Sequence, residues 1–347
     1  MLFTENIGGN YMVIFIGSII VMLSMNDLNS FLILYKNRAM IYLTDFIIPR
    51  DSWVDSYFSP VPVSGIPKNM PRAPQNTHIN SWYPWHIFYN RGMCEFSFED
   101  ITIFYGGNGS GKTTLLNVIA QRLRVQRLSR YNRSVCFDDY ISVCNYSLAD
   151  SDSERCVQRG SILVSDDVFD SILKKREENE RIDHRRDELI DDYYAYKYTT
   201  ELPRENLTDP QTLELYKNIH NARSGRKSCS QFVKANLNRN LKEQSNGETA
   251  FEFFVQSIKD DSLVLLDEPE NSLSAKWQME LVRYIIGAVR AFRCQFVIAT
   301  HSPFLLSIPG AKIYDLDQMP IKTEQWYNLE NVRCYYQLFE DNKHLFK

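Results

Sequence analysis

The sequence predicts an α/β fold in which a mixed, largely parallel β-sheet forms the core and a lobe of helices is inserted into it. Two short apolar runs, 262–266 and 295–300, are bounded by structure-breaking residues and flank a helical pattern over 275–293, as buried parallel strands joined by a helix do. A glycine-rich turn at 106–111 separates a strand pattern from a helical one. Residues 168–198 are dense in charge and sparse in apolar positions, which indicates an exposed helix.

The other elements follow from periodicity and turn residues. Apolar residues alternate after Met40 and predict a first strand, and five prolines between Ser59 and Pro74 argue against both a helix and a central strand there. We expect, in chain order, a strand at 40–49, a β-rich stretch over 82–104, a helix at 114–128, two or three helices within 168–243, a strand at 312–317 and a helix at 331–341.

The chain divides into five predicted segments. They are an N-terminal extension (1–39), the first half of the core (40–164), the helical insertion lobe (165–243), the second half of the core (244–317) and a C-terminal tail with a helix (318–347). Within the extension, Tyr11–Met25 carries no charged residue, which leaves three interpretations open. The stretch is a membrane anchor, or a buried first element of the fold, or part of an upstream sequence translated in frame ahead of a start at Met40.

The membrane signal is weak, because a spanning helix needs about 20 apolar residues and no Lys or Arg precedes the stretch as a secretory signal requires. Translation of upstream sequence ahead of Met40 is the interpretation that the sequence favours. The composition narrows the class of protein further. With 39 basic and 43 acidic residues the net charge is −4, which excludes a uniformly basic nucleic-acid binder. An apolar content of 44% excludes disorder as the dominant state. Seven cysteines without a CxxC pair argue against a disulfide scaffold or a zinc ribbon and favour the reducing cytoplasm.

Residues 106–113, GGNGSGKT, match the phosphate-binding pattern G-x-x-x-x-G-K-[ST]. Such a loop lets backbone N–H groups converge on phosphate oxygens, and the helix that follows adds the positive end of its dipole. Lys112 would neutralise the β- and γ-phosphates, and the hydroxyl of Thr113 would ligate Mg²⁺. The predicted nucleotide-binding residues are Gly106, Gly107, Asn108, Gly109, Ser110, Gly111, Lys112, Thr113 and Thr114.

Two further groups follow predicted strands. The apolar run 263–266 ends in Asp267 and Glu268, a Walker B pattern. Asp267 would hold Mg²⁺ through water, and Glu268 would polarise the attacking water as the catalytic base. His301 comes directly after the run at 295–300, where it would hydrogen-bond the γ-phosphate. Alone, the acidic pair indicates a solvated loop and the histidine a structural residue, but together with Lys112 they favour catalysis.

The order of these motifs resembles that of the ATP-binding cassette (ABC) ATPases. The residues that carry the resemblance are the phosphate loop, QSNGE at 244–248, DEPENSLS at 267–274 and THSPFLL at 300–306. They are most similar to the SMC and RecF-like branch, and within it to compact bacterial "AAA-family ATPases", some of which accompany phage-defence systems. The resemblance implies a P-loop NTPase fold of the ABC type and an ATP hydrolase that uses ATP and Mg²⁺.

The resemblance also implies a homodimer with two ATP molecules at its interface. Ser245, Gly247 and Glu248 would act on the nucleotide held by the other subunit, and Ser272–Ser274 would form the D-loop between the sites. The QSNGE segment at 244–248 corresponds to the signature motif of these ATPases, and Asn246 stands where that motif usually has glycine. Two features are left open. The Q-loop residue is Gln158 or lies within 165–167, and the aromatic that stacks on adenine is one of Trp82, Trp85 and Phe88.

Two functions are compatible with these expectations. The first is a clamp or sensor on double-stranded DNA, of the DNA-repair or phage-defence type, for which basic residues over 122–133 and 223–234 would track the phosphate backbone. The alternative is an ATP-dependent switch that binds an effector protein from the same operon, such as a nuclease or toxin, without DNA contact. The first predicts both basic stripes on one face of the dimer. The second predicts an exposed apolar patch on the lobe or on the C-terminal helix.

Overall fold

The chain forms two compact units, one made of Met1–Val168 together with Asn246–Lys347 and the other of Phe169–Ser245. The computed structural model describes residues 40–59, 70–74, 82–199, 209–225, 228–237 and 246–346, and it gives the backbone alone for Asn246 and for three strands within residues 4–24. Those strands, β1 (Thr4–Asn6), β2 (Tyr11–Ile16) and β3 (Ile19–Ser24), pair antiparallel in the order β1-β2-β3. No helix in the described part of the chain is both long and apolar enough to cross a bilayer.

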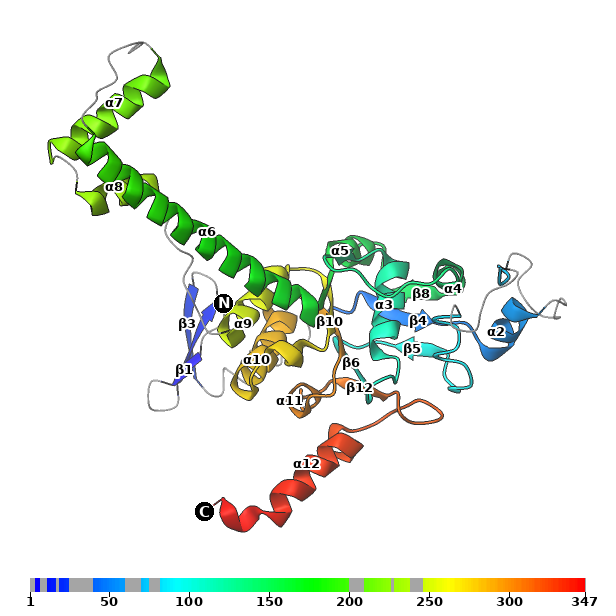
Figure 1. Cartoon of the computed structure of the whole chain (residues 1–347). Helices are drawn as coiled ribbons and strands as arrows, with labels where there is room; N and C mark the ends of the chain where they lie inside the picture. Colours follow the sequence, from blue (N-terminus) through cyan, green and yellow to red (C-terminus); the bar gives the residue numbers. More distant parts are fainter. Residues whose placement is uncertain are drawn as a thin grey trace. The chain divides into compact units, whose positions relative to one another are not determined.

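A seven-stranded sheet forms the centre of the first unit (Figure 1). Its order is β13-β12-β6-β11-β10-β9-β7, and every neighbouring pair is parallel except β12 with β13. The strands are β6 (Ile101–Tyr105), β7 (Gln126–Arg127), β9 (Ser161–Val164), β10 (Leu263–Asp267), β11 (Gln295–Ala299), β12 (Lys312–Asp315) and β13 (Lys322–Thr323). The two apolar runs are thus neighbouring parallel strands, as predicted, and their carboxyl ends meet at one edge of the sheet.

A second, antiparallel sheet has the order β5-β4-β8 and contains β4 (Leu43–Ile47), β5 (Glu95–Ser97) and β8 (Asn145–Leu148). The hydrophobic core joins it to the central sheet around helix α3 (Lys112–Leu123). Gln295 also links the two sheets. Its buried amide accepts from the backbone N–H groups of Tyr42 and Leu43 and donates to the Leu43 carbonyl. The predicted strand after Met40 is therefore an integral part of the core.

The helices of the first unit alternate with the strands, as an α/β fold requires. Besides α3 they are α2 (Asp51–Phe58), α4 (Phe137–Val143), α5 (Ser153–Arg159), α9 (Asn246–Ser257), α10 (Ala275–Ala291), α11 (Pro303–Leu306) and α12 (Glu330–Asp341), with short 3₁₀ turns η2 (Pro269–Ser272), η3 (Trp326–Asn328) and η4 (Lys343–Leu345). Rings of Phe251 in α9 and Trp277 in α10 stack at 5.3 Å, which holds these two helices together.

One prediction was wrong in part. Residues 82–92 form turns, and within 82–104 only β5 and β6 are strands. Asn90 and Gly92 have positive φ angles of 58° and 69°, which interrupt an extended chain. The aromatic residues that made this stretch look β-rich fold into the core instead. Trp85 is fully buried and stacks on Tyr57 at 4.0 Å.

The second unit consists of helices, as the charge pattern predicts. It contains α7 (Pro210–Arg223), α8 (Cys229–Asn236) and most of the long helix α6 (Ser165–Tyr198). A small apolar cluster packs the three helices together, made of Leu189, Tyr193, Ala222, Phe232 and Val233. The α8 start is well defined because Ser228 and Gln231 form a capping box.

Candidate nucleotide-binding site

The glycine-rich loop lies between β6 and α3, where the motif requires it. Gly111 caps α3 with a φ of 101°, and a Cβ added there would lie 2.7 Å from Ile87 Cγ2, so only glycine fits. The first turn of α3 contains no acidic side chain, which leaves the positive end of the helix dipole unopposed. Ser110 Oγ is buried and has no hydrogen-bond partner within the described residues. A loop with such an unpaired polar atom beside a helix N-terminus fits a phosphate group.

The side chain of Lys112 folds back over this loop. It is only 4% exposed, and its Nζ donates to the carbonyl oxygens of Gly106 at 2.8 Å and Gly107 at 2.9 Å. The same Nζ lies 3.5 Å from Glu268 Oε1. The ammonium group is therefore fixed at the mouth of the loop, next to the proposed catalytic base.

Thr113 and Asp267 meet directly. The Thr113 hydroxyl donates to Asp267 Oδ1 at 2.9 Å, which joins the start of α3 to the end of β10. Both groups offer oxygen ligands of the kind that Mg²⁺ prefers. The pair therefore fits a magnesium ion that is also coordinated by phosphate oxygens, which is the arrangement that the sequence predicts.

Glu268 follows Asp267 in a left-handed conformation, with φ 46° and ψ 51°. Its backbone N–H donates to the Ala299 carbonyl at 2.9 Å, and its Oε2 accepts from Asn271 Nδ2 at 3.0 Å. This tight turn directs the carboxylate toward Lys112. Lys112, Thr113, Asp267 and Glu268, predicted from separate motifs, thus form one connected group.

Burial raises the pKa of Asp267 to about 6, and the hydrogen bond from Thr113 opposes this only in part. The protonated carboxyl therefore stabilises the fold fully below about pH 4, and this contribution disappears as the pH rises through 6. Asp267→Asn stays neutral, so without magnesium and nucleotide we expect it to be more stable than the natural protein at pH 8, by up to about 3 kcal/mol.

Thermal unfolding of the two proteins between pH 4 and pH 8 measures this difference. The advantage of Asp267→Asn should shrink toward pH 4, and magnesium with ATP should raise the unfolding temperature of the natural protein more than that of the variant. Parallel pH profiles for the two proteins would contradict the raised pKa of Asp267.

His301 lies at the end of β11, next to β6 and β10, and its side chain is 42% exposed. Its backbone N–H donates to Oε1 of Glu270 at 2.9 Å, and its carbonyl accepts from Asn331 Nδ2 at 2.9 Å. The sequence placed His301 beside the Walker B strand, and this neighbourhood is confirmed. Glu270 and Asn331 had no predicted role.

The signature residues are described only in part. Ser245 lies outside the described residues, whereas Gly247 and Glu248 belong to the first turn of α9. A Cβ added to Gly247 would lie 2.6 Å from Trp277 Cδ1 in α10, so glycine allows these two helices to approach. The close packing of α9 and α10 thus requires glycine at position 247, in addition to the predicted contact of Gly247 with the γ-phosphate.

The structure narrows the two assignments left open by the sequence. Gln158 is exposed on α5, before β9, and contacts Glu154. Residues 165–167 follow β9 directly, and Val164 is paired in register with Asp267, which favours them for the Q-loop. Trp85 and Phe88 are buried in the core, and Trp82 is partly buried and stacks on Phe58 at 4.2 Å. Trp85 and Phe88 therefore present no free ring face to a base.

Asp317 is a loop contact that the sequence analysis missed. Its Oδ2 accepts from the backbone N–H of Gly107 at 2.7 Å. In the sequence, the only sign of this contact is an acidic residue two positions after the last residue of β12. The contact with the phosphate loop depends on the strand order, which places β12 next to β6. This carboxylate ties the phosphate loop to the neighbouring strand.

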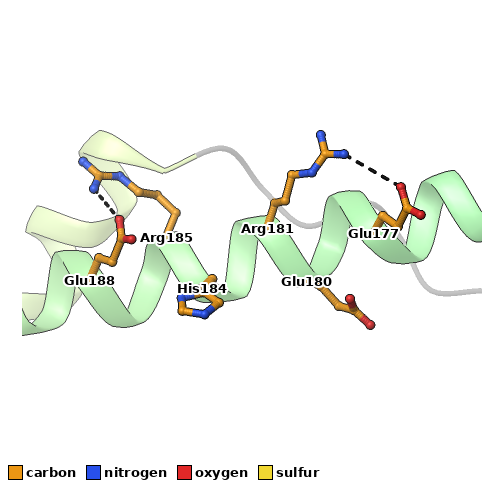
Figure 2. A pocket seen from close by; sticks show the side chains of 6 residues that line it. All are labelled: Glu177, Glu180, Arg181, His184, Arg185 and Glu188. Atoms are coloured by element: carbon orange, nitrogen blue, oxygen red, sulfur yellow. Dashed lines mark hydrogen bonds and ion pairs between the residues drawn. The ribbon is translucent and has the colours of Figure 1, made fainter.

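A hollow on the second unit is lined by residues of α6 alone (Figure 2). The lining residues are Glu177, Glu180, Arg181, His184, Arg185 and Glu188. Figure 2 shows them along one helix, with Arg185 paired to Glu188 at 2.6 Å and Arg181 to Glu177 at 3.8 Å. These exposed ion pairs lie within one helix and each stabilises it by about a few tenths of a kcal/mol. The hollow is therefore a solvated face of α6.

Residues 159–307 match the family model described as "AAA domain, putative AbiEii toxin, Type IV TA system". The matched segment contains Asp267, Glu268, Glu270 and His301, and the phosphate loop precedes it. The chain has a P-loop NTPase fold. Its phosphate loop between β6 and α3 and its largely parallel sheet confirm the predicted α/β class with a P-loop NTPase core. No curated protein matches the sequence of this P-loop NTPase.

Three solved structures are similar to this P-loop NTPase. A protein described as "a putative metal-chelate type ABC transporter" in an inward-facing conformation has 17% identity and a TM-score of 0.33, and the match covers 68% of this chain and 76% of that one. The Smc head domain from Pyrococcus furiosus, with an extended coiled coil and bound to the C-terminal domain of ScpA, has 12% identity and a TM-score of 0.33. The match covers 72% of this chain and 95% of that one. Stu0660 of Streptococcus thermophilus has 16% identity and a TM-score of 0.34, covering 67% and 72%.

Proposed function

We propose that the chain binds and hydrolyses ATP. The observation that carries this proposal is the 3.5 Å approach of Lys112 and Glu268 next to the hydrogen bond between Thr113 and Asp267. The residues proposed as phosphate anchor, magnesium ligands and base are thereby grouped at the carboxyl ends of β6 and β10, the two strands that flank β11. Ligands bind at this edge in open α/β sheets.

Each residue of the candidate site has its own proposed role in ATP hydrolysis. The phosphate loop and Lys112 would hold the β- and γ-phosphates, and Glu268 would accept a proton from the attacking water. Bound Mg²⁺ would neutralise phosphate charge, held by the Thr113 hydroxyl and the Asp267 carboxylate. His301 would hydrogen-bond the γ-phosphate from the adjacent strand. Phosphoryl transfer needs mainly positioning and charge neutralisation, which this group supplies.

We further propose that the active form is a homodimer with two ATP molecules at its interface. The signature residues Ser245, Gly247 and Glu248 of one copy would complete the site of the other, as the resemblance to ABC ATPases implies. ATP would then favour the closed dimer, and hydrolysis would open it. Such a switch requires contacts that differ between the two states, and a γ-phosphate shared by two subunits provides them.

One of the two candidate cellular roles is a clamp or sensor on double-stranded DNA. Three arginines of its first basic stripe have partners within the chain. Arg122 donates to the Cys144 carbonyl, Arg127 to Asn117 and Arg133 to Asp138. These contacts leave fewer free cations for a phosphate backbone, although Arg124 and Arg130 are exposed.

A specific observation favours the alternative, a switch that holds a partner protein. Helix α12 carries Tyr335, Tyr336, Leu338 and Phe339, which are between 43% and 56% exposed. An exposed apolar group of this kind marks an interaction surface, as predicted for a switch that binds a partner protein.

Steady-state ATP hydrolysis by the full chain, with and without double-stranded DNA, tests these roles. Glu268→Gln serves as the blank. Stimulation by DNA that falls as salt rises would support the clamp or sensor. Slow hydrolysis that is indifferent to DNA would support the partner-bound switch. Phosphate release no faster than in the blank would contradict the proposed ATPase.

A further inference from the structure

Glu270 is a buried carboxylate without a role in the functions considered so far. It lies in the 3₁₀ turn η2, three residues after Asp267, and its side chain is 5% exposed. Its Oε1 accepts from the Thr300 hydroxyl at 2.6 Å and from the backbone N–H of His301 at 2.9 Å. Burying a carboxylate is costly unless it is paired and hydrogen-bonded. Here both donors come from the loop that carries His301.

The imidazole of His301 also faces this carboxylate. Its Nδ1 lies 3.3 Å from Glu270 Oε1 but is not aligned as a hydrogen-bond donor, and Glu270 Oε2 is buried with no partner within the described residues. A rotation of the imidazole ring would let Nδ1–H donate to this carboxylate. Catalytic hydrogen bonds are often loose before the substrate complex forms.

We propose that Glu270 is the positioning residue for His301. The carboxylate accepts from Nδ1–H, and this fixes the tautomer and leaves Nε2 on the opposite side of the ring. Nε2 then faces the nucleotide side. Once Nε2 takes up a proton from solvent, its N–H can donate to a γ-phosphate oxygen, while Nδ1–H still donates to the Glu270 carboxylate. The inference deepens the proposed function and rests on it, because it assigns the orientation of one residue of that same site.

The two glutamates of the turn have separate partners. Glu268 has a side chain that is 26% exposed and lies 3.5 Å from Lys112, which suits a group that exchanges protons with water. Glu270 is buried, and among the described residues its carboxylate contacts only Thr300 and His301. Glu270 therefore acts through His301, while Glu268 acts on water.

The His301 loop is held independently of Glu270. The backbone N–H of Thr300 donates to the Phe104 carbonyl, Ser302 Oγ donates to Gln278 Oε1 at 2.7 Å, and Asn331 Nδ2 donates to the His301 carbonyl at 2.9 Å. The backbone path of this loop should therefore survive a conservative change at Glu270. What such a change releases is the rotation of the imidazole ring.

A double-mutant cycle with Glu270→Gln and His301→Ala tests the coupling. Glu270→Gln is expected to lower kcat by about 10- to 100-fold, the range for groups that orient a functional histidine, with KM for ATP nearly unchanged. In the His301→Ala background the same change should have no further effect on kcat. The matched control is Glu280→Gln, which changes a glutamate of α10 that is 36% exposed and paired with Arg283. An equal loss in both backgrounds would overturn the proposal.

A second readout does not depend on activity or on the stability of the Glu270 variant. Nitrogen NMR of histidine side chains in the full chain reports the tautomer of His301, assigned by its loss in His301→Ala, at a pH above the ordinary histidine pKa of about 6.5. We expect the Nδ1–H form. The Nε2–H form in the natural protein would overturn the proposal whatever the activity. The Nδ1–H form in a protein without ATPase activity would support the positioning role and contradict the proposed function alone.

Discussion

Replacing Glu268 by glutamine is expected to lower the rate of ATP hydrolysis by about 10²–10⁴-fold, the range that a general base contributes, while ATP binding persists. Water reaches the partly exposed Glu268 carboxylate, and Asn271 Nδ2 donates to its Oε2 at 3.0 Å and orients it. Glutamine keeps the size of the side chain and accepts the same hydrogen bond. It cannot take a proton from the attacking water, so only the chemical step should suffer.

Phosphate release measures the rate, and gel filtration with light scattering measures ATP retention and molecular mass. If hydrolysis opens the proposed dimer, Glu268→Gln should retain ATP and remain dimeric under conditions in which the natural protein returns to monomers. Glu280→Gln makes the same chemical change outside the site and should behave as the natural protein does. Full turnover in Glu268→Gln would remove Glu268 from the role of base.

Much of the candidate nucleotide site could be predicted from the sequence, because its signals are local. A strand, a glycine-rich turn and a helix follow one another within residues 101–123, and the residue types alone define the phosphate loop. Asp267 and Glu268 end an apolar run in the same way. Parallel strands place their carboxyl ends together at one edge of a sheet, so the approach of Lys112 to Glu268 followed from two separate local patterns.

Contacts that depend on the order of the strands could not be predicted in this way. Asp317 reaches Gly107 only because β12 lies next to β6, and Glu270 reaches His301 only because β11 lies next to β10. Periodicity identifies a buried strand without naming its neighbours. The same reason explains Trp85, whose ring suggested a base-stacking site but is buried against Tyr57, a residue of a helix in another part of the chain.

Replacing Lys112 by alanine is expected to weaken ATP binding by about 30-fold or more, since removing one partner of a buried charge pair costs about 2–5 kcal/mol. Lys112 Nζ is bound to the carbonyl oxygens of Gly106 and Gly107. It is therefore already positioned in the loop, and little side-chain entropy is lost when phosphate binds. The substitution also leaves Glu268 without its nearest cation, so binding and turnover should fall together.

Calorimetric titration with a slowly hydrolysed ATP analogue measures this loss, and thermal unfolding shows whether the loop has kept its structure. Lys112→Met is the companion variant, because it retains the length of the buried stem and removes only the charge. Lys174→Ala, an exposed lysine on α6, controls for the loss of one positive charge from the chain. If both Lys112 variants fold and bind the analogue as tightly as the natural protein does, the phosphates do not lie on this loop. Binding that is lost in Lys112→Met as well as in Lys112→Ala would assign the effect to the ammonium charge, since packing is conserved in the methionine variant.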